Sequence, residues 1–461
     1  MFAINCLKDS NNNSKSVIGM KAFISWLIIM MTIIVVRHIL SKEKPHGPTN
    51  HMHVHIALKN FFSCIDWSKT SRPTEFVPLP EAQERVLSND LTSRVNLPPF
   101  AKAERDGYAV KSNDTKEASR KHSILLKFIG RITAGQDAEF TVESGKAVAI
   151  ATGAKVPKGA DAVIMIEDTK LENNIVKVFK QIERGKNISA EGEEVKNGQT
   201  LLKKGTWLSS QDLGLMASVG LGKVPVYKKP EVAVFATGDE LVEPGSKLDE
   251  ACIYESNRYM ISAMVRECGG KVVDLGICRD DRDVILYKLK EALNFDILVV
   301  SGGASVGEKD YVPEIINDLG KPGLVVHGIA MKPGSPTGLG VVNYKPIIIT
   351  PGFPVSSYLA FYTFGRPLIL QMLKTQGPPE AKLIARMGDN ISVHNDFRTF
   401  VRVNVVKKNG SYLAMPISAS GASLLSTLTK SNGIIIVENN TRLLKGKKVD
   451  VILLRNLGVY P

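Results

Sequence analysis

The chain has 461 residues, of which 44% are apolar and 23% are charged, an ordinary composition for a globular protein. This length accommodates about three or four domains with sizeable cores. The five cysteines are scattered and form no close pair of the kind that zinc or redox motifs need, so we expect reduced thiols and a cytoplasmic location. The net charge of +13 is not arranged as a basic stripe with interleaved aromatic residues, which argues against nucleic-acid binding.

The first 60 residues hold seven basic and two acidic side chains, a net charge of +5 that leaves +8 for the other 401 residues. That remainder suits an acidic small molecule. We expect residues 1–56 to form a leader or tether, in which residues 22–40 are largely apolar. Two interpretations of the apolar segment stay open: a membrane anchor that leaves the rest of the chain cytoplasmic, or an upstream stretch ahead of a later start such as Met52.

Short elements are expected next along the chain. Helical spacing predicts a helix over 79–86, and residues 100–182 show short alternating apolar runs separated by Gly and Pro, which predict a small β-rich domain. A second helix is expected over 208–218, before a break at 228–230. Past the prolines at 378–379 the alternation returns and predicts a small β-barrel or sandwich.

Between 230 and 374 the pattern changes to alternating strands and helices. It predicts a doubly wound α/β sheet that binds its ligand at the carboxyl ends of the strands. The expected strands are 232–236, 271–275, 296–300 and 346–350, and the expected helices are 257–268, 282–293, 310–319 and 355–373.

The most informative stretch is FDILVVSGGASVGEKD at 295–310, where an apolar strand runs into glycines and then into a helix start. Gly302, Gly303 and Gly307 permit backbone conformations and a close approach that side chains would block. The helix that follows would direct its amide groups and its positive dipole end toward a phosphate. A second glycine-bearing strand end, at 232–241, also carries carboxylates, and together the two predict a site for a phosphorylated ligand and a divalent cation.

A set of further motifs, taken in order, points to one family. They are PPFAKAERDGYAV (98–110), IATGAKVPKGADAVIMIED (150–168), GEEV (192–195), TGDEL (237–241), IYESNRYM (253–260), RDD (279–281), SGGASVGEKDY (301–311), MKPGSPTGLG (331–340) and TPGFPVS (350–356). Over residues 72–461 this set resembles the molybdopterin molybdotransferases, or molybdenum insertases, whose family includes the E domain of gephyrin.

The resemblance implies a cytoplasmic homodimer that inserts molybdate into adenylylated molybdopterin, releases AMP and requires Mg²⁺. Tungstate stays open as an alternative oxyanion. The implied partners are the enzymes that make and adenylylate molybdopterin and the apoproteins of molybdoenzymes. The implied domains are a discontinuous helical linker domain (72–97 with 183–228), a small β domain (98–182), an α/β/α molybdopterin-binding domain (229–374) and a C-terminal β-barrel (380–461).

The resemblance also assigns roles to individual residues. An aspartate before glycine commonly caps a turn, but Asp106 matches the aspartate of the DGYA motif, which is thought to act directly in insertion. The implied catalytic residues are Asp106, Thr152 and Glu240. The implied substrate-binding residues are Ser301, Gly302, Gly303, Ser305, Gly307, Lys332, Pro351 and Pro354. The implied metal ligands are Asp280, Asp310 and Glu194, since Mg²⁺ takes one or two carboxylates together with phosphate oxygens and water.

Several positions depart from the family pattern. Ser335 replaces a frequent lysine, Glu194 replaces a common aspartate, Phe353 replaces the usual asparagine, and Ala422 replaces a serine. These changes leave the reaction class intact and bear on ligand affinity and oxyanion preference.

Two rival functions are retained. Adenylylation of molybdopterin is one, because the enzyme of that step shares the α/β/α domain, although it lacks the flanking β domains and the DGYA motif. A non-catalytic, membrane-tethered scaffold of the gephyrin type is the other, with residues 22–40 as its anchor.

Overall fold

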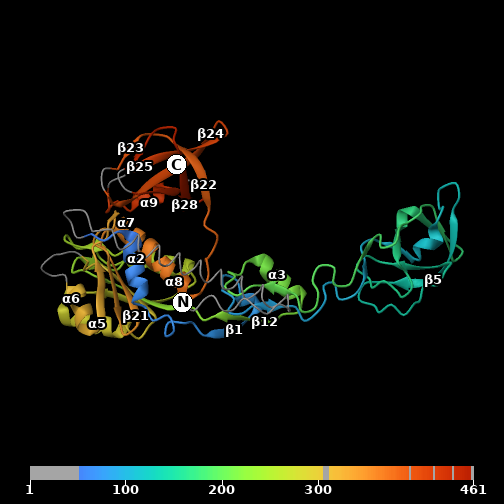
Figure 1. Ribbon diagram of the computed structural model, residues 1–461, viewed down its shortest axis with the longest axis horizontal. Coiled ribbons are helices and arrows are strands. Elements are labelled where there is room, and N and C mark those ends of the chain that lie inside the picture. The colour runs from blue at the N-terminus through green and yellow to red at the C-terminus, as the bar shows by residue number, and fades with distance from the viewer. Residues whose placement is uncertain (1–50, 305–310, 394–395, 419–420, 439–440, 458–461) are drawn as a thin grey trace, which may run out of the picture. The chain divides into compact units, whose positions relative to one another are not determined.

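The computed structural model describes residues 51–304, 311–393, 396–418, 421–438 and 441–457 (Figure 1). The apolar segment 22–40 and the site candidates Ser305, Gly307 and Asp310 lie outside these residues. None of the helices in the described part of the chain combines the length and the apolar character that crossing a bilayer requires.

The α/β domain is built on a six-stranded sheet in the order β16-β13-β17-β21-β20-β18. Its first four strands are parallel, and β20 and β18 continue the sheet antiparallel. The strands are β13 (Glu231–Thr237), β16 (Lys271–Cys278), β17 (Ile297–Ser301), β18 (Pro322–His327), β20 (Gly338–Val342) and β21 (Lys345–Thr350), with a short parallel pair β14 (Leu241–Val242) and β15 (Ile253–Tyr254) beside them. The four parallel strands confirm the predicted ones, whereas β18 and β20 were not predicted.

Helices cover both faces of this sheet (Figure 1). They are α4 (Asn257–Glu267), α5 (Arg282–Ala292), α6 (Tyr311–Leu319), α7 (Pro354–Ala360), the π-helix η4 (Phe361–Gly365) and α8 (Arg366–Met372). Helices α5 and α6 share a buried core with Phe235, Val300 and Ile349. Because successive strand side chains point to opposite faces, α4 and the α7–α8 segment cover the other face.

Helix α2 (Val54–Ser63) corrects the predicted leader, which was expected to run to residue 56. Val54, Ala57 and Phe61 recur at helical spacing and are all buried. The helix packs against β18 and β20, so residues 54–56 belong to the folded domain rather than to a tether.

The linker domain is assembled from two separate stretches of the chain. Strand β1 (Thr74–Pro78) pairs with β12 (Lys223–Tyr227), β2 (Leu91–Thr92) pairs with β11 (Thr200–Leu202), and α3 (Ser210–Ser218) completes it. The helix predicted over 79–86 is wrong, because only the 3-10 turn η1 (Leu79–Glu81) forms. Glu84 adopts a φ of 59°, which ends helical geometry, and Val86 pairs instead with Trp207.

The small β domain has a six-stranded sheet in the order β7-β4-β6-β5-β9-β8. Its elements are β3 (Lys102–Ala103), β4 (Gly107–Val110), η2 (Ser112–Thr115), β5 (Ile124–Ile132), β6 (Lys146–Ile150), β7 (Ala162–Met165), η3 (Ile166–Asp168), β8 (Thr169–Glu172), β9 (Ile175–Val178) and β10 (Ile188–Ser189). Gly107 is required where β4 meets β7, because a Cβ at this position would lie 1.8 Å from the Ile164 carbonyl oxygen.

The C-terminal domain is a closed five-stranded barrel, which decides between the barrel and the sandwich left open by the sequence. Its strands follow the order β24-β25-β22-β28-β26, and β26 pairs back to β24. The elements are β19 (Met331–Lys332), β22 (Lys382–Met387), β23 (Ile391–Ser392), β24 (Arg398–Lys408), β25 (Ser411–Ser418), α9 (Ser426–Lys430), β26 (Gly433–Val437), β27 (Arg442–Leu443) and β28 (Lys448–Leu453), with β19 added in parallel to β24.

Candidate functional site

Of the eleven predicted site residues that the structure describes, seven lie at one edge of the α/β sheet. Strands β16, β13, β17 and β21 are neighbours and run parallel, so the loops that follow them emerge side by side. These loops begin after Cys278, Thr237, Ser301 and Thr350 respectively. The sheet therefore brings together the glycine turn, two of the predicted carboxylates and the loop with Pro351.

The glycine turn after β17 is tightly fitted against β13. Gly302 and Gly303 have φ angles of 95° and 61°, which side chains disfavour. A Cβ on Gly302 would lie 2.4 Å from the Thr237 carbonyl oxygen, and one on Gly303 would lie 2.7 Å from Val312 Cγ2. The Gly302 amide donates to the Thr350 carbonyl at 3.0 Å, while the Gly303 amide makes no hydrogen bond within the described chain.

Carboxylates flank this turn. Thr237 donates its hydroxyl proton to Asp280 Oδ1, and the Asp280 amide donates to Asp239 Oδ1 at 3.1 Å. The Glu240 carboxylate folds back over Gly238, where an added Cβ would meet its oxygens at 2.8 and 2.9 Å. Within the described residues, no three His, Cys, Asp or Glu side chains are grouped closely enough to hold a metal ion.

Sequence reasoning missed Asn257, the first residue of α4, as a part of this edge. Its Nδ2 donates to Ser301 Oγ at 2.9 Å and to the Gly352 carbonyl at 2.7 Å. Ser301 was predicted to bind substrate. The residue is 2% exposed, and its hydroxyl oxygen accepts the hydrogen bond from Asn257. The only sequence signal for Asn257 was its place in the motif IYESNRYM.

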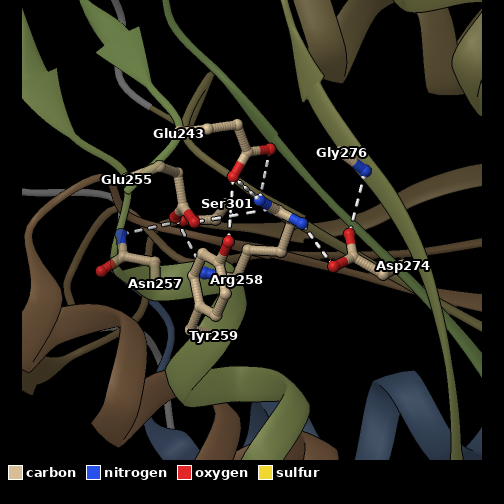
Figure 2. A network of polar contacts seen from close by, with 8 residues as sticks. All are labelled: Glu243, Glu255, Asn257, Arg258, Tyr259, Asp274, Gly276 and Ser301. Carbon is tan, nitrogen blue, oxygen red and sulfur yellow. Dashed lines mark hydrogen bonds and ion pairs between the residues drawn. The ribbon is translucent and has the colours of Figure 1, made fainter. Parts of the chain in front are cut away.

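Arg258 fixes the start of α4 among three carboxylates, as Figure 2 shows. Its guanidinium contacts both oxygens of Glu243, at 2.6 and 2.5 Å, and also Asp274, and its Nε lies 3.6 Å from Glu255 Oε2. The Arg258 amide donates to Glu255 Oε1 at 2.8 Å. Burial raises the pKa of Glu255. The hydrogen bond from the Arg258 backbone amide and the positive charge of the Arg258 guanidinium oppose that rise.

Other candidates lie on the strands and loops nearby. Lys332 is exposed on β19, beside Thr399 of β24, and has no carboxylate partner in the described chain. Pro351 is buried, and Pro354 is the first residue of α7, as expected of residues that shape a loop. Phe353, between them, is 60% exposed.

In the small β domain the structure brings Asp106 and Thr152 together. The Thr152 amide and hydroxyl donate to Asp106 Oδ1 at 2.7 and 3.1 Å, and both residues are exposed. The second carboxylate oxygen of Asp106 makes no hydrogen bond within the described residues, so it is available to a ligand. This geometry suits a carboxylate that acts on a ligand.

Glu194 was predicted as a metal ligand beside Asp280. It is exposed in a turn of the linker domain, where its amide donates to the Leu97 carbonyl at 3.0 Å. None of its contacts in the described chain involves Asp280 or another predicted metal ligand, so its assignment remains a prediction without structural support.

Comparison with known families decides the relationship. Residues 52–220 match the MoeA N-terminal region (domain I and II), residues 233–371 match a probable molybdopterin binding domain, and residues 385–454 match the MoeA C-terminal region (domain IV). The molybdopterin molybdenumtransferase of Bacillus subtilis is 35% identical over 388 residues, which cover 83% of this chain and 90% of the relative. The chain belongs to the MoeA family.

Other MoeA relatives agree with this assignment. A putative molybdopterin biosynthesis protein of Methanocaldococcus jannaschii is 33% identical over 411 residues, covering 87% of this chain and 96% of that protein. A crystal structure of the molybdopterin biosynthesis MoeA protein from a Pyrococcus species superimposes with a TM-score of 0.75 at 34% identity, covering 88% of this chain and all of the other. The family predicted from the motifs is thereby confirmed, as is the multidomain MoeA fold.

Proposed function

We propose that this chain is a molybdopterin molybdenumtransferase that inserts molybdate into adenylylated molybdopterin and releases AMP. The proposal is carried by the glycine turn at Gly302 and Gly303, set beside Thr237 and Asp280 in a chain of the MoeA family. Relatives bearing that enzyme name match most of the chain, including its small β domain and its barrel. Both of these domains are absent from the smaller adenylylating enzyme considered as a rival.

The glycine turn would hold the pyrophosphate of the substrate. The Gly302 amide already donates a hydrogen bond to the Thr350 carbonyl. The Gly303 amide has no hydrogen-bond acceptor in the described chain, so it is the group that would donate to the pyrophosphate. Glycine at both positions lets the phosphate oxygens approach the backbone without a side chain in the way. Lys332 adds a compact positive charge with three donors for an oxyanion.

The carboxylates at this edge of the sheet are suitable ligands for Mg²⁺. Asp280 and Glu240 offer hard oxygen ligands, and Mg²⁺ normally takes only one or two carboxylates and completes its shell with phosphate oxygens and water. When bound there, the ion would shield the pyrophosphate from molybdate. Thr237 holds Asp280 in place for this role by donating a hydrogen bond to one of its oxygens.

Asp106 is proposed to position molybdate and the reacting sulfurs of the pterin. Two hydrogen bonds from Thr152 fix one of its oxygens and leave the other for the substrate. A carboxylate held in this way needs no reorganisation when the substrate arrives, which is the main source of catalysis by positioning. No covalent attachment of substrate to the protein is required.

The test uses the full-length purified chain with adenylylated molybdopterin, molybdate and Mg²⁺. AMP release that depends on molybdate is the expected result, with heat-inactivated protein as the control. Failure to release AMP from this mixture would contradict the proposal. Pyrophosphate formation from ATP and molybdopterin would support the adenylyltransferase instead.

We also propose that the active form is a homodimer in which Asp106 of one copy acts with the glycine turn of the other. The test mixes two inactive variants, Asp106→Ala and Gly303→Val, after joint unfolding and refolding. Recovery of up to about a quarter of the wild-type activity is expected if random pairing unites one intact set of residues in half of the dimers. An inactive mixture of dimers, with dimer mass confirmed by light scattering, would contradict shared sites.

A further inference from the structure

Asn257 joins two loops that the mechanism uses, although no motif assigned it a role. It is 6% exposed and begins α4, and its single amide group donates one hydrogen bond to each loop. One acceptor is the Ser301 hydroxyl, at the start of the glycine turn. The other is the carbonyl of Gly352, which directly precedes Phe353 and the start of α7.

The helix that carries Asn257 is itself anchored, so the side chain is presented from a fixed base. Arg258 is 4% exposed and reaches Glu243 after β14, Asp274 in β16 and Glu255 before α4 (Figure 2). The Glu255 carboxylate accepts the Arg258 amide and stabilises the positive end of the helix. The ion pairs thus connect α4 to β14 and β16, while Asn257 connects it to the loops after β17 and β21.

We propose that Asn257 is a positioning residue for the pyrophosphate-bearing substrate, because it sets the separation between the glycine turn at 301–303 and the loop at 351–353. This inference rests on the proposed function. Asn257 acts through these two loops, because its amide hydrogens are donated to Ser301 and Gly352. Its effect is to hold the Gly303 amide where the phosphate binds.

The chemistry of the site favours this role over a packing role. A buried amide costs free energy unless it is hydrogen-bonded, and within the described residues the Asn257 Oδ1 atom has no hydrogen-bond partner. An apolar side chain at this position would avoid the cost of this unpaired oxygen. The two donated bonds are what an apolar side chain cannot supply, and both end on loops at the ligand edge of the sheet.

The test compares Asn257→Ala with two matched variants on the same helix. Ser262→Ala removes a buried hydroxyl that makes no hydrogen bond to the described part of the chain, and Val265→Ala removes buried apolar atoms. Val265→Ala is expected to lower the unfolding temperature without affecting either loop, which separates lost stability from lost positioning. Ser262→Ala is expected to behave as wild type.

The first readout needs no ligand. Hydrogen exchange at the Gly302 amide, which is bonded to the Thr350 carbonyl, should accelerate in Asn257→Ala and remain unchanged in both matched variants. The second readout is the binding of adenylylated molybdopterin, which should weaken by about 10- to 100-fold in Asn257→Ala alone, as expected for two lost hydrogen bonds. The KM for molybdate should not change.

The outcomes separate this inference from the proposed function. If the wild-type chain does not bind adenylylated molybdopterin, the proposed function fails, and exchange at Gly302 alone decides whether Asn257 holds the turn. If the wild type binds and Asn257→Ala binds equally well, with unchanged exchange, the positioning role is overturned. Equal weakening by Asn257→Ala and Val265→Ala would also overturn it, because general destabilisation would then explain the loss.

Discussion

Replacing Gly302 with alanine is expected to damage both stability and ligand binding. At a φ of 95° an alanine is strained, which costs about 1–3 kcal/mol. The new Cβ would also lie 2.4 Å from the Thr237 carbonyl oxygen, and a backbone atom cannot rotate away as a side chain can. Relief of such a contact typically costs about 1–3 kcal/mol, so the total is about 2–6 kcal/mol.

A loss of this size is a large share of the roughly 5–15 kcal/mol that stabilises a typical domain. The movement that relieves the contact would carry the turn away from the Thr350 carbonyl and displace the Gly303 amide from the proposed phosphate position. The assay is urea unfolding together with molybdate-dependent AMP release. Gly222→Ala is the matched control, because Gly222 lies in the linker domain outside the loops of the sheet edge, an added Cβ there meets no atom within 4 Å and its φ is not positive.

The reasoning predicts a large difference between the two variants in both measurements. If Gly302→Ala unfolds at the same urea concentration as Gly222→Ala and releases AMP at the same rate, the tight fit of the turn against Thr237 is not what the site requires. The argument for the phosphate-binding turn would then be refuted.

Three further predictions concern other parts of the chain. Asp106→Ala is expected to lower AMP release by about 100- to 1,000-fold with little change in substrate binding. Thr152→Val keeps the hydrogen bond from the backbone amide to Asp106 and should lower AMP release by only about 2- to 10-fold. Equal losses in the two variants would contradict the proposed geometry. Gly214→Ala in the exposed middle of α3 should raise the free energy of unfolding by about 0.5–1 kcal/mol, as measured by urea unfolding, because an added Cβ meets no atom within 4 Å; a lower value would count against this account of α3. Burial raises the pKa of the Cys268 thiol to about 12, so iodoacetamide at pH 8 should modify half-buried Cys64 well before Cys268. Mass spectrometry is the measurement, labelling of the unfolded chain is the control, and equal labelling of the two thiols in the folded chain would contradict the prediction.

The α/β domain shows how far local sequence carries a prediction. The runs of β-branched residues in β13, β17 and β21 are buried on both faces, and such runs are legible without any tertiary information. The glycines at 302 and 303 were equally legible, because glycine adopts positive φ angles such as those of the turn without the strain that other residues meet. By contrast, the helix predicted over 79–86 failed because Val86 and Leu87 form β-bridges with residues far along the chain, and that pairing overrides helical spacing.

The sequence by itself therefore determined the family, the doubly wound sheet and the chemical character of the site, because apolar periodicity and glycine turns depend on neighbouring residues. Only the tertiary structure decided which side chains meet. Asn257 reaches Ser301 across 44 residues of sequence and Gly352 across 95, and Thr237 reaches Asp280 across 43. These contacts follow from the order of parallel strands in the sheet, which places the ends of distant segments side by side and which no local pattern records.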